Sequence, residues 1–272
     1  MPEGDTIHRT AATLRRALEG AEVTAVSTRV GQVRALGPDR LVGQAVAAVE
    51  PRGKHLLIWF APSDLALHSH MRMSGSWHLY RHGERWRKPE RLARITLETE
   101  AWQAVCFSAP VLALLDRRQV TSQPSLAALG PDALDEVTDL AEAGRRLAAA
   151  GSQPIGEALL DQRILAGVGN VYRCEVLFLR GLDPWTPVND LDEDERGGVL
   201  ATAERLLKDN IASGSPRRVT TGRFDGAGDR LFVYGKARRP CPRCQTPIAV
   251  ARQGSQARVT FWCPRCQGPG PR

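Results

Sequence analysis

The first residues of the chain are the ones whose types point most directly to covalent chemistry. Pro2 follows Met1, and an aminopeptidase can remove a methionine that precedes a small residue, leaving Pro2 with a free secondary amine. Such an amine attacks an aldehyde-like carbon to form an iminium, as lysine amines do in Schiff-base enzymes. An α-amino group titrates near about 7.7–8.0, so a useful fraction is neutral at physiological pH. Glu3 lies beside it as a candidate proton carrier. Taken alone, the same pattern also fits an ordinary chain start.

Four cysteines near the other end have the spacing of a metal site. They form the pattern C-x2-C, then 18 residues, then C-x2-C, with the members Cys241, Cys244, Cys263 and Cys266. This is the spacing of a four-thiolate zinc site, and four thiolates leave no open position for catalysis, so the zinc would be structural. Two disulfides are the alternative. The sequence has no evident signal peptide or apolar membrane-spanning run, which favours a reducing cytosol and therefore zinc.

The charge of the chain is concentrated at its C-terminal end. The formal net charge is +7, and the segment 215–272 carries twelve Lys and Arg against two Asp and Glu. That segment therefore has a net charge of +10, which leaves −3 for the rest of the chain. A basic surface of this kind favours a polyanionic partner, and its combination with a zinc module indicates nucleic acid rather than a merely solvated charged face.

The elements that must position these residues can be read from periodicity. Ile7, Ala11, Leu14 and Leu18 predict an amphipathic helix that ties down the N-terminus. Seven short β-rich or alternating segments follow, and their number predicts a sandwich or barrel: Glu22–Thr28, Gln44–Glu50, His55–Phe60, Leu65–His70, Ser76–Tyr80, Arg91–Thr99 and Trp102–Phe107. Helical periodicity dominates from Ile155 to about Ser213, where the acidic run Asp190–Glu195 should begin a helix. The alternation around Ile248 and Val259 predicts a small hairpin between the cysteine pairs.

The fold class expected is therefore α+β and multidomain. The predicted domains are a β-sandwich with its leading helix (1–125), a helical domain with a connector (126–235) and a zinc-finger module (236–272). Gly167-Val168-Gly169-Asn170 predicts a tight turn that opens a helix, because glycine permits positive φ and Asn170 can cap the helix. Free backbone N–H groups at such a helix start can hold a phosphate.

The two ends and the segments between them resemble the formamidopyrimidine-DNA glycosylase / endonuclease VIII family of base-excision repair enzymes. The resembling segments occur in the family's order across nearly the whole chain. They are Pro2-Glu3, the lysine segment 51–55, the His-containing void-filling loop 69–75, the helix–two-turn–helix segment 159–173, Arg258 and the four cysteines. Each segment alone is weak evidence for the family, except the four-cysteine zinc ribbon. The complete set in the family's order is highly specific.

The resemblance assigns roles to individual residues. It implies a catalytic group of Pro2, Glu3, Lys54 and Arg258, and DNA contacts by Lys54, Arg258, His70, Asn170, Tyr172 and Gln162. It also implies that Arg72, Met73 and Ser74 fill the void left by a flipped nucleotide. Such an enzyme is a bifunctional glycosylase: the Pro2 amine attacks C1′, the damaged base leaves, an iminium forms, and β- and δ-elimination cleave the strand. Its substrate is damaged double-stranded DNA and also single-stranded DNA, and the resemblance implies a cytoplasmic, nucleoid-associated monomer without a membrane segment.

Departures from the family pattern bear on the lesion class. Formamidopyrimidine-type members carry an Arg-x-Phe pair on a second loop, and the matching stretch, 109–113, has neither residue. A shifted alignment onto Asp116-Arg117-Arg118 would restore an arginine but not the phenylalanine. The single-loop wedge favours the endonuclease VIII branch and oxidised pyrimidines. Two alternatives stay open: an 8-oxoguanine-type glycosylase on the same scaffold, and a zinc-ribbon DNA-binding protein without catalysis.

Overall fold

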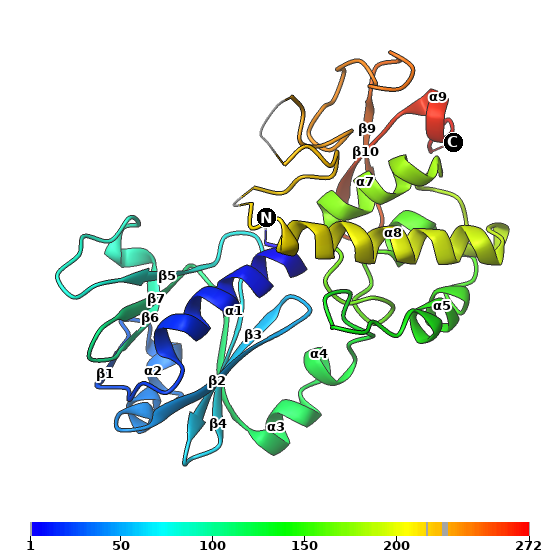
Figure 1. Cartoon of the computed structure of the whole chain (residues 1–272). Coiled ribbons are helices and arrows are strands. Elements are labelled where there is room, and N and C mark those ends of the chain that lie inside the picture. Colours follow the sequence, from blue (N-terminus) through cyan, green and yellow to red (C-terminus); the bar gives the residue numbers. More distant parts are fainter. Residues whose placement is uncertain (1, 216, 225–227, 272) are drawn as a thin grey trace. The chain divides into compact units, whose positions relative to one another are not determined.

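The computed structural model describes residues 2–215, 217–224 and 228–271, so Met1 lies outside the described residues. The chain divides into two compact units, 1–128 and 129–272. The predicted boundary at 125/126 lies close to this division, and the separate zinc-finger module 236–272 stays a prediction. Each unit is described by itself below (Figure 1).

Unit 1 contains two four-stranded antiparallel sheets, with strand orders β1-β6-β7-β5 and β2-β3-β4-β8. The strands are β1 (Ala25–Ser27), β2 (Ala45–Arg52), β3 (His55–Ala61), β4 (Leu65–His70), β5 (Ser76–Tyr80), β6 (Ala93–Glu98), β7 (Gln103–Phe107) and β8 (Val111–Asp116). Ile58 and Leu67 of one sheet and Ile95 and Leu97 of the other belong to a single buried cluster. The sandwich expected from the strand count is confirmed. Short helices complete the unit: α2 (Gly31–Arg34), η1 (Pro38–Leu41), η2 (Glu90–Leu92), α3 (Arg117–Ser122) and α4 (Pro124–Ala127).

The predicted N-terminal helix is α1 (Gly4–Leu18). Its four periodic apolar residues are each at most 1% exposed and join the sandwich core: Ile7, Ala11, Leu14 and Leu18. The end of α1 is also tied to β2, because Arg15 donates to the Val49 carbonyl (2.6 Å) and the Glu19 carboxylate accepts from the Val49 amide (2.8 Å). The helix therefore fixes the residues at its start against a rigid sheet (Figure 1).

Strand β8 was not among the predicted strands. It pairs antiparallel with β4, with Val111 opposite His70 and Asp116 opposite Leu65. Its sequence, VLALLD, is an apolar run without alternation, so period-two patterning gives no signal for it. The strand closes the second sheet beside the histidine-bearing strand β4.

Unit 2 begins with helices and ends with the hairpin β9 (Ala249–Gln253) and β10 (Arg258–Trp262). The helices are α5 (Leu140–Ala148), α6 (Ile155–Ala158), α7 (Asn170–Arg180), η3 (Val188–Asp190), α8 (Glu193–Ala212) and α9 (Pro264–Gln267). Asp192 caps α8 by accepting from the Glu195 amide (2.7 Å), so the acidic run begins this helix as expected. The predicted hairpin is confirmed, and its module packs on α7 through a buried cluster that includes Cys174, Phe178 and Ile248.

Candidate functional site

The N-terminal residues are held by the start of α1. Glu3 is the N-cap of the helix and is 1% exposed, while Pro2 before it is half-buried. The Glu3 amide donates to Thr6 Oγ1 (3.4 Å), and Thr6 in turn donates to Asp5 (3.3 Å). Asp5 is buried and paired with Arg9 at 2.8 Å. Thr6 therefore braces the turn that carries Pro2 and Glu3.

Lys54 lies in a two-residue turn between β2 and β3. Arg52 pairs with His55 across this turn, and Gly53 takes a positive φ of 56° that favours glycine. Lys54 is half-buried. His70 pairs directly with His55 at the end of β4, so the turn brings Lys54 and His70 to the same end of the sheet.

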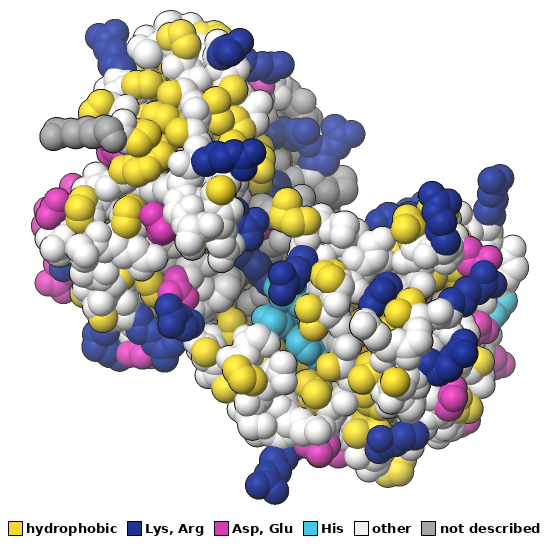
Figure 2. Space-filling model, turned by 180° about the vertical axis from the view of Figure 1, so that it is seen from behind, with side chains coloured by type: hydrophobic (Ala, Val, Ile, Leu, Met, Phe, Trp, Pro, Cys, Tyr) yellow, Lys and Arg dark blue, Asp and Glu magenta, His cyan; other side chains and the backbone are white. Residues whose placement is uncertain are grey.

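Sequence reasoning singled out His70 but missed two further histidines beside it. His55 Nδ1 lies 2.8 Å from His68 Nε2, and the His55 ring meets the His70 ring edge-on at 4.6 Å between centroids. His68 and His70 are two residues apart on one strand, so their side chains lie on the same face of the sheet. This spacing is the sequence signal that could have identified His68. Figure 2 shows a group of histidine side chains lying together on the face of the molecule drawn there.

All three imidazoles are neutral at pH 7. Burial lowers the pKa of His55 to about 3, helped by the repulsion that protonated His70 or His68 would exert and by the Lys54 ammonium. Burial and the field of His70 lower the pKa of His68 to about 4. Burial together with the cations Lys54 and Arg72 lowers the pKa of His70 to about 4. The cluster thus offers uncharged hydrogen-bonding groups beside the ammonium of Lys54.

The predicted void-filling loop projects from the sandwich between β4 and β5. Arg72, Met73 and Ser74 are exposed, Met73 by 62%, whereas Met71 is 2% exposed and belongs to the core. Gly75 closes the turn by donating to the Met71 carbonyl (2.8 Å), and a Cβ there would lie 2.7 Å from Met71 backbone atoms. A buried methionine therefore anchors a loop that presents an exposed one.

The link between β7 and β8 contains no arginine that could serve as the second-loop arginine of the family pattern. Only Ser108, Ala109 and Pro110 join β7 to β8, and the Ser108 carbonyl accepts from Ser74 Oγ (3.4 Å). Arg117 lies beyond the opposite end of β8, roughly 17 Å along a six-residue strand, and it is paired with Asp64 at 2.6 Å. The shifted alignment onto Arg117 is therefore wrong.

In unit 2 the glycine turn before α7 has the predicted form but different hydrogen bonds. Gly167 takes a positive φ of 99°. The N-cap of α7 is Gly169, so the expectation that Asn170 caps the helix is corrected. Gln162 is half-buried, and the DNA contact assigned to it stays a prediction. Its amide donates to the Leu160 and Val168 carbonyls (2.8 and 3.0 Å) and accepts from the Gly167 amide (3.1 Å), so it shapes the turn from within.

Asn170 instead reaches the zinc-finger hairpin. Its Nδ2 donates to the Val259 carbonyl (2.8 Å), which also accepts from Arg173 (3.1 Å). Arg173 is fully buried and donates further to Thr260 Oγ1 (2.7 Å). The structure thus brings Asn170 close to half-buried Arg258, the residue before Val259.

Two further residues of α7 shape the basic segment that precedes the hairpin. Glu175 is fully buried, and its carboxylate accepts from three consecutive main-chain amides (2.6–2.9 Å), those of residues 232–234, and from the Thr220 hydroxyl. The predicted DNA contact by Tyr172 is corrected: this side chain is fully buried, with the Arg218 guanidinium 4.8 Å from its ring centroid. Sequence reasoning missed Arg173 and Glu175, because charged residues in a helix usually face solvent.

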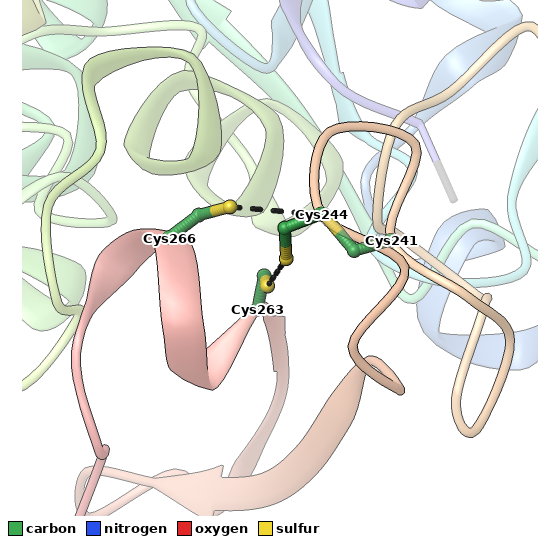
Figure 3. Close-up of side chains that lie close together, drawn as sticks. All are labelled: Cys241, Cys244, Cys263 and Cys266. Atoms are coloured by element: carbon green, nitrogen blue, oxygen red, sulfur yellow. Dashed lines mark hydrogen bonds between the residues drawn. The ribbon is translucent and has the colours of Figure 1, made fainter.

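The four cysteines come together in one cluster (Figure 3). Sγ atoms lie 3.4 Å apart in the pair Cys244–Cys263 and 3.9 Å apart in the pair Cys241–Cys266, and all four lie within 4.8 Å of one another. A disulfide needs about 2.05 Å, so both pairs are thiols. A tetrahedral ion with metal–sulfur bonds of about 2.3 Å requires sulfur–sulfur edges of about 3.8 Å, which the donor set fits. The cluster can therefore hold a metal ion.

No helix in the described part of the chain has the length and apolar character required to cross a bilayer.

The chain matches known proteins over its full length. Residues 1–122 match the formamidopyrimidine-DNA glycosylase N-terminal domain, and residues 129–220 match the H2TH domain of that glycosylase. The chain is 44% identical to probable endonuclease 8 2 of Streptomyces coelicolor (100% of this chain, 96% of the relative). It is 41% identical to the DNA-(apurinic or apyrimidinic site) lyase Nei2 of Mycolicibacterium smegmatis (98% and 99%) and 34% identical to endonuclease 8 of Escherichia coli (98% and 100%).

Solved structures show the same fold. Formamidopyrimidine-DNA glycosylase of Lactococcus lactis, bound non-covalently to DNA that contains an AP site, aligns with a TM-score of 0.83 at 23% identity (98% of this chain, 99% of that one). MutM in complex with DNA that contains carbocyclic 8-oxo-G aligns with the same score at 25% identity and the same coverage. The two domain matches and the 34–44% identity to endonuclease 8 proteins over nearly the whole chain show its family. The chain belongs to the formamidopyrimidine-DNA glycosylase / endonuclease VIII family of DNA glycosylases.

Proposed function

We propose that the protein is a bifunctional DNA glycosylase and AP lyase that removes oxidised pyrimidines through a Schiff base on Pro2. The observation that carries the proposal is the placement of Pro2 directly before the buried N-cap Glu3, on a helix fixed to the sandwich. A terminus held in this way keeps its amine at a defined position, which a frayed chain end does not do. Family membership and the endonuclease 8 relatives support the same assignment.

The chemistry follows from a secondary amine beside a carboxyl group. The neutral Pro2 nitrogen bonds to C1′ of the flipped nucleotide, the base departs with its bonding pair, and the sugar ring opens to give an iminium. Loss of a C2′ proton then breaks the bond to the 3′ phosphate, and a second elimination breaks the bond to the 5′ phosphate. Glu3 is the group next to Pro2 that can carry protons in these steps.

The DNA contacts are assigned to both units. Lys54 and His70 in unit 1, and Arg258 and the start of α7 at Asn170 in unit 2, offer cations and hydrogen-bond donors to backbone phosphates. Half-buried Gln162 in the turn before α7 is assigned a further DNA contact, and buried Tyr172 supports this surface from beneath. The exposed Met73, flanked by Arg72 and Ser74, is the wedge that fills the space of the extruded nucleotide.

One structural zinc is assigned to the cysteine cluster. Four thiolates complete a tetrahedral coordination sphere, so the ion would stabilise the hairpin that carries Arg258 and take no part in the reaction. We further assign damaged double-stranded and single-stranded DNA as substrates, with the chain acting as a monomer at the nucleoid. The proposed domain division is 1–125, 126–235 and 236–272.

The test is covalent trapping with borohydride on a duplex that contains an abasic site. The full chain is produced with a cleavable N-terminal tag, and cleavage exposes Pro2, as intact mass verifies. We expect a DNA-linked product only after cleavage. Equal trapping by the tagged chain would overturn the assignment of Pro2, and DNA binding without trapping by the processed chain would favour the non-catalytic zinc-ribbon alternative.

A further inference from the structure

The three-histidine cluster contains more than the one imidazole that the family resemblance explains. His55 and His70 face each other on β3 and β4, and His68 lies behind them, 1% exposed. The other groups around the cluster are the Lys54 ammonium, the Arg72 guanidinium and Arg52, which pairs with Glu50 at 3.4 Å. The β8 residues opposite His68 and His70 are Ala113 and Val111, which carry no charge.

The hydrogen bond to His70 fixes where its proton lies. The Arg72 main-chain N–H donates to His70 Nδ1 (3.2 Å), so Nδ1 is the acceptor. A neutral imidazole that accepts at one nitrogen carries its proton on the other. His70 is therefore the Nε2–H tautomer, and among the described residues nothing bonds to that Nε2.

The same reasoning fixes the protons of the buried pair. The His55 Nδ1 to His68 Nε2 bond (2.8 Å) needs one donor, and the buried Nδ1 of His68 has no partner among the described residues. A buried N–H without an acceptor is rarer than a buried acceptor without a donor. His68 therefore donates from Nε2 and leaves its bare Nδ1 in the core. His55 accepts at Nδ1 and carries its proton on Nε2, at the edge of the cluster where 8% of the residue is exposed.

We propose that His55 is a further DNA-phosphate contact, donating from Nε2 beside His70 and Lys54, and that His68 is the positioning residue that fixes its tautomer. This proposal rests on the proposed phosphate contacts of Lys54 and His70. His55 packs edge-on against His70 at 4.6 Å between ring centroids, and Lys54 precedes His55 in the turn, so two neutral imidazoles and one ammonium belong to the same end of the sheet. A phosphate has acceptor oxygens enough for all three.

Neutral donors leave a distinctive signature in the salt dependence of binding. A cation that neutralises a phosphate releases counterions, and its loss lowers the slope of log K against log salt by roughly 0.9. An uncharged imidazole adds a hydrogen bond without releasing an ion, so its loss lowers the affinity and leaves the slope unchanged. This difference separates a role for His55 as a donor from any role as a charge.

The experiment uses the full chain at pH 7.5, where the histidines are neutral, and measures anisotropy with undamaged and abasic duplexes at several salt concentrations. His55→Phe keeps an aromatic ring but removes the donor, and His55→Gln keeps an amide N–H near the position of Nε2. His68→Met removes the donor to His55, and His68→Gln retains one. Lys54→Ala and His70→Phe test the proposed phosphate contacts of Lys54 and His70, and His82→Gln, outside the cluster, is the control.

Long-range ¹H–¹⁵N correlation spectra of the unmodified protein show directly which imidazole nitrogen carries the proton, and they need no variant.

We expect His55→Phe to weaken binding roughly two- to tenfold with an unchanged salt slope, and His55→Gln to restore most of the affinity. His68→Met should lose part of the affinity and show a proton on His55 Nδ1, whereas His68→Gln should resemble the unmodified protein. A proton on Nδ1 of His55 in the unmodified protein overturns the proposal. The proposal is also overturned if His55→Phe binds DNA with the affinity of the unmodified protein while Lys54→Ala and His70→Phe bind more weakly. If those two variants also bind normally, the phosphate contacts of the proposed function fail instead.

Discussion

The side-chain amide of Asn170 donates a 2.8 Å hydrogen bond to the main-chain carbonyl of Val259. This bond joins the first residue of α7 to the strand that begins with Arg258, and Arg173 supports it by donating to the same carbonyl. A helix start and a hairpin far apart in sequence are thus fixed to each other at the residues assigned to phosphate binding. The geometry predicts that Asn170 and Arg258 act as a coupled pair.

We expect Arg258→Ala to weaken binding to damaged and undamaged duplexes alike and to lower the salt slope by about one unit. Asn170→Ala removes one of the two donors to the Val259 carbonyl and loosens the strand that carries Arg258. The double variant should therefore cost less than the sum of the single ones, with a coupling of about 0.5–3 kcal/mol. Affinities measured across salt concentrations test this, with Arg252→Ala, an exposed charge on β9, as the control. Additive costs would mean that the two residues bind independently.

The histidine cluster makes stability depend on pH. The folded-state pKa values of His55, His68 and His70 are about 3, 4 and 4, below the ordinary 6.5, so the unfolded chain binds more protons as pH falls from about 6.5 to 4. Stability is therefore full above pH 6.5 and falls below it, by up to about 1.4 kcal/mol per pH unit for each histidine. Urea unfolding between pH 7 and 5 should show a shallower fall for His68→Gln than for the unmodified chain or His82→Gln. Identical pH profiles would contradict the depressed pKa of His68.

Removal of the metal should unfold the hairpin module rather than the sandwich. We expect about one zinc per chain, and Cys263→Ser or a strong chelator should weaken DNA binding, because metal-binding free energy is folding free energy in such modules. The α1–sandwich core contains none of the four ligands. Proteolysis should therefore cut first in the C-terminal segment of the metal-free protein. Full DNA affinity in a chain shown to lack metal would refute this role.

The two methionines of the β4–β5 loop should respond in opposite ways. Met73→Ala removes an exposed side chain, so stability should stay within about 0.5 kcal/mol while excision of a base from a duplex slows. Met71→Ala opens a cavity in the core and should destabilise the protein by about 2–5 kcal/mol. Thermal unfolding and single-turnover excision, measured on both variants, separate the wedge from its anchor. Normal excision by Met73→Ala would remove this residue from the wedge.

The sequence was sufficient for elements whose pattern is regular. The periodicity of Ile7, Ala11, Leu14 and Leu18 predicts α1, and the cysteine spacing predicts the cluster, since both depend only on local geometry. The strand β8 could not be found in this way, because a continuous apolar run has no period. The start of α7 was predicted to within one residue: Asn170 was expected to be the N-cap, and Gly169 is. The sequence could not show this difference, because the Asn170 amide donates instead to the carbonyl of Val259, which is distant in sequence.

Buried polar residues were the hardest to predict. Arg173, Glu175 and His68 are each at most 1% exposed, and each satisfies partners on other elements. A sequence shows such residues as charged or polar positions on a helix or strand, which are usually solvated. Tyr172 was assigned to the surface for the same reason: its type fits a DNA contact, and only the packing reveals that its side chain is fully buried.

The lesion class is the last prediction, and it depends on the size of the wedge. The link Ser108–Pro110 contains neither residue of an Arg-x-Phe pair, and Arg117 is held at the far end of β8 by Asp64. The space of the flipped nucleotide must then be filled from one loop, which makes fewer contacts with the orphaned partner base. Since direct readout requires specific contacts to base edges, discrimination by the partner base should be weak.

We expect excision of thymine glycol and 5-hydroxyuracil, cleavage at abasic sites in double- and single-stranded DNA, and much slower removal of 8-oxoguanine opposite cytosine. Single-turnover rates on duplexes that differ only in the lesion and its partner base decide the matter: if 8-oxoguanine opposite cytosine is the fastest substrate, the protein is an 8-oxoguanine-type enzyme, and a group other than a second-loop arginine must contact the partner base.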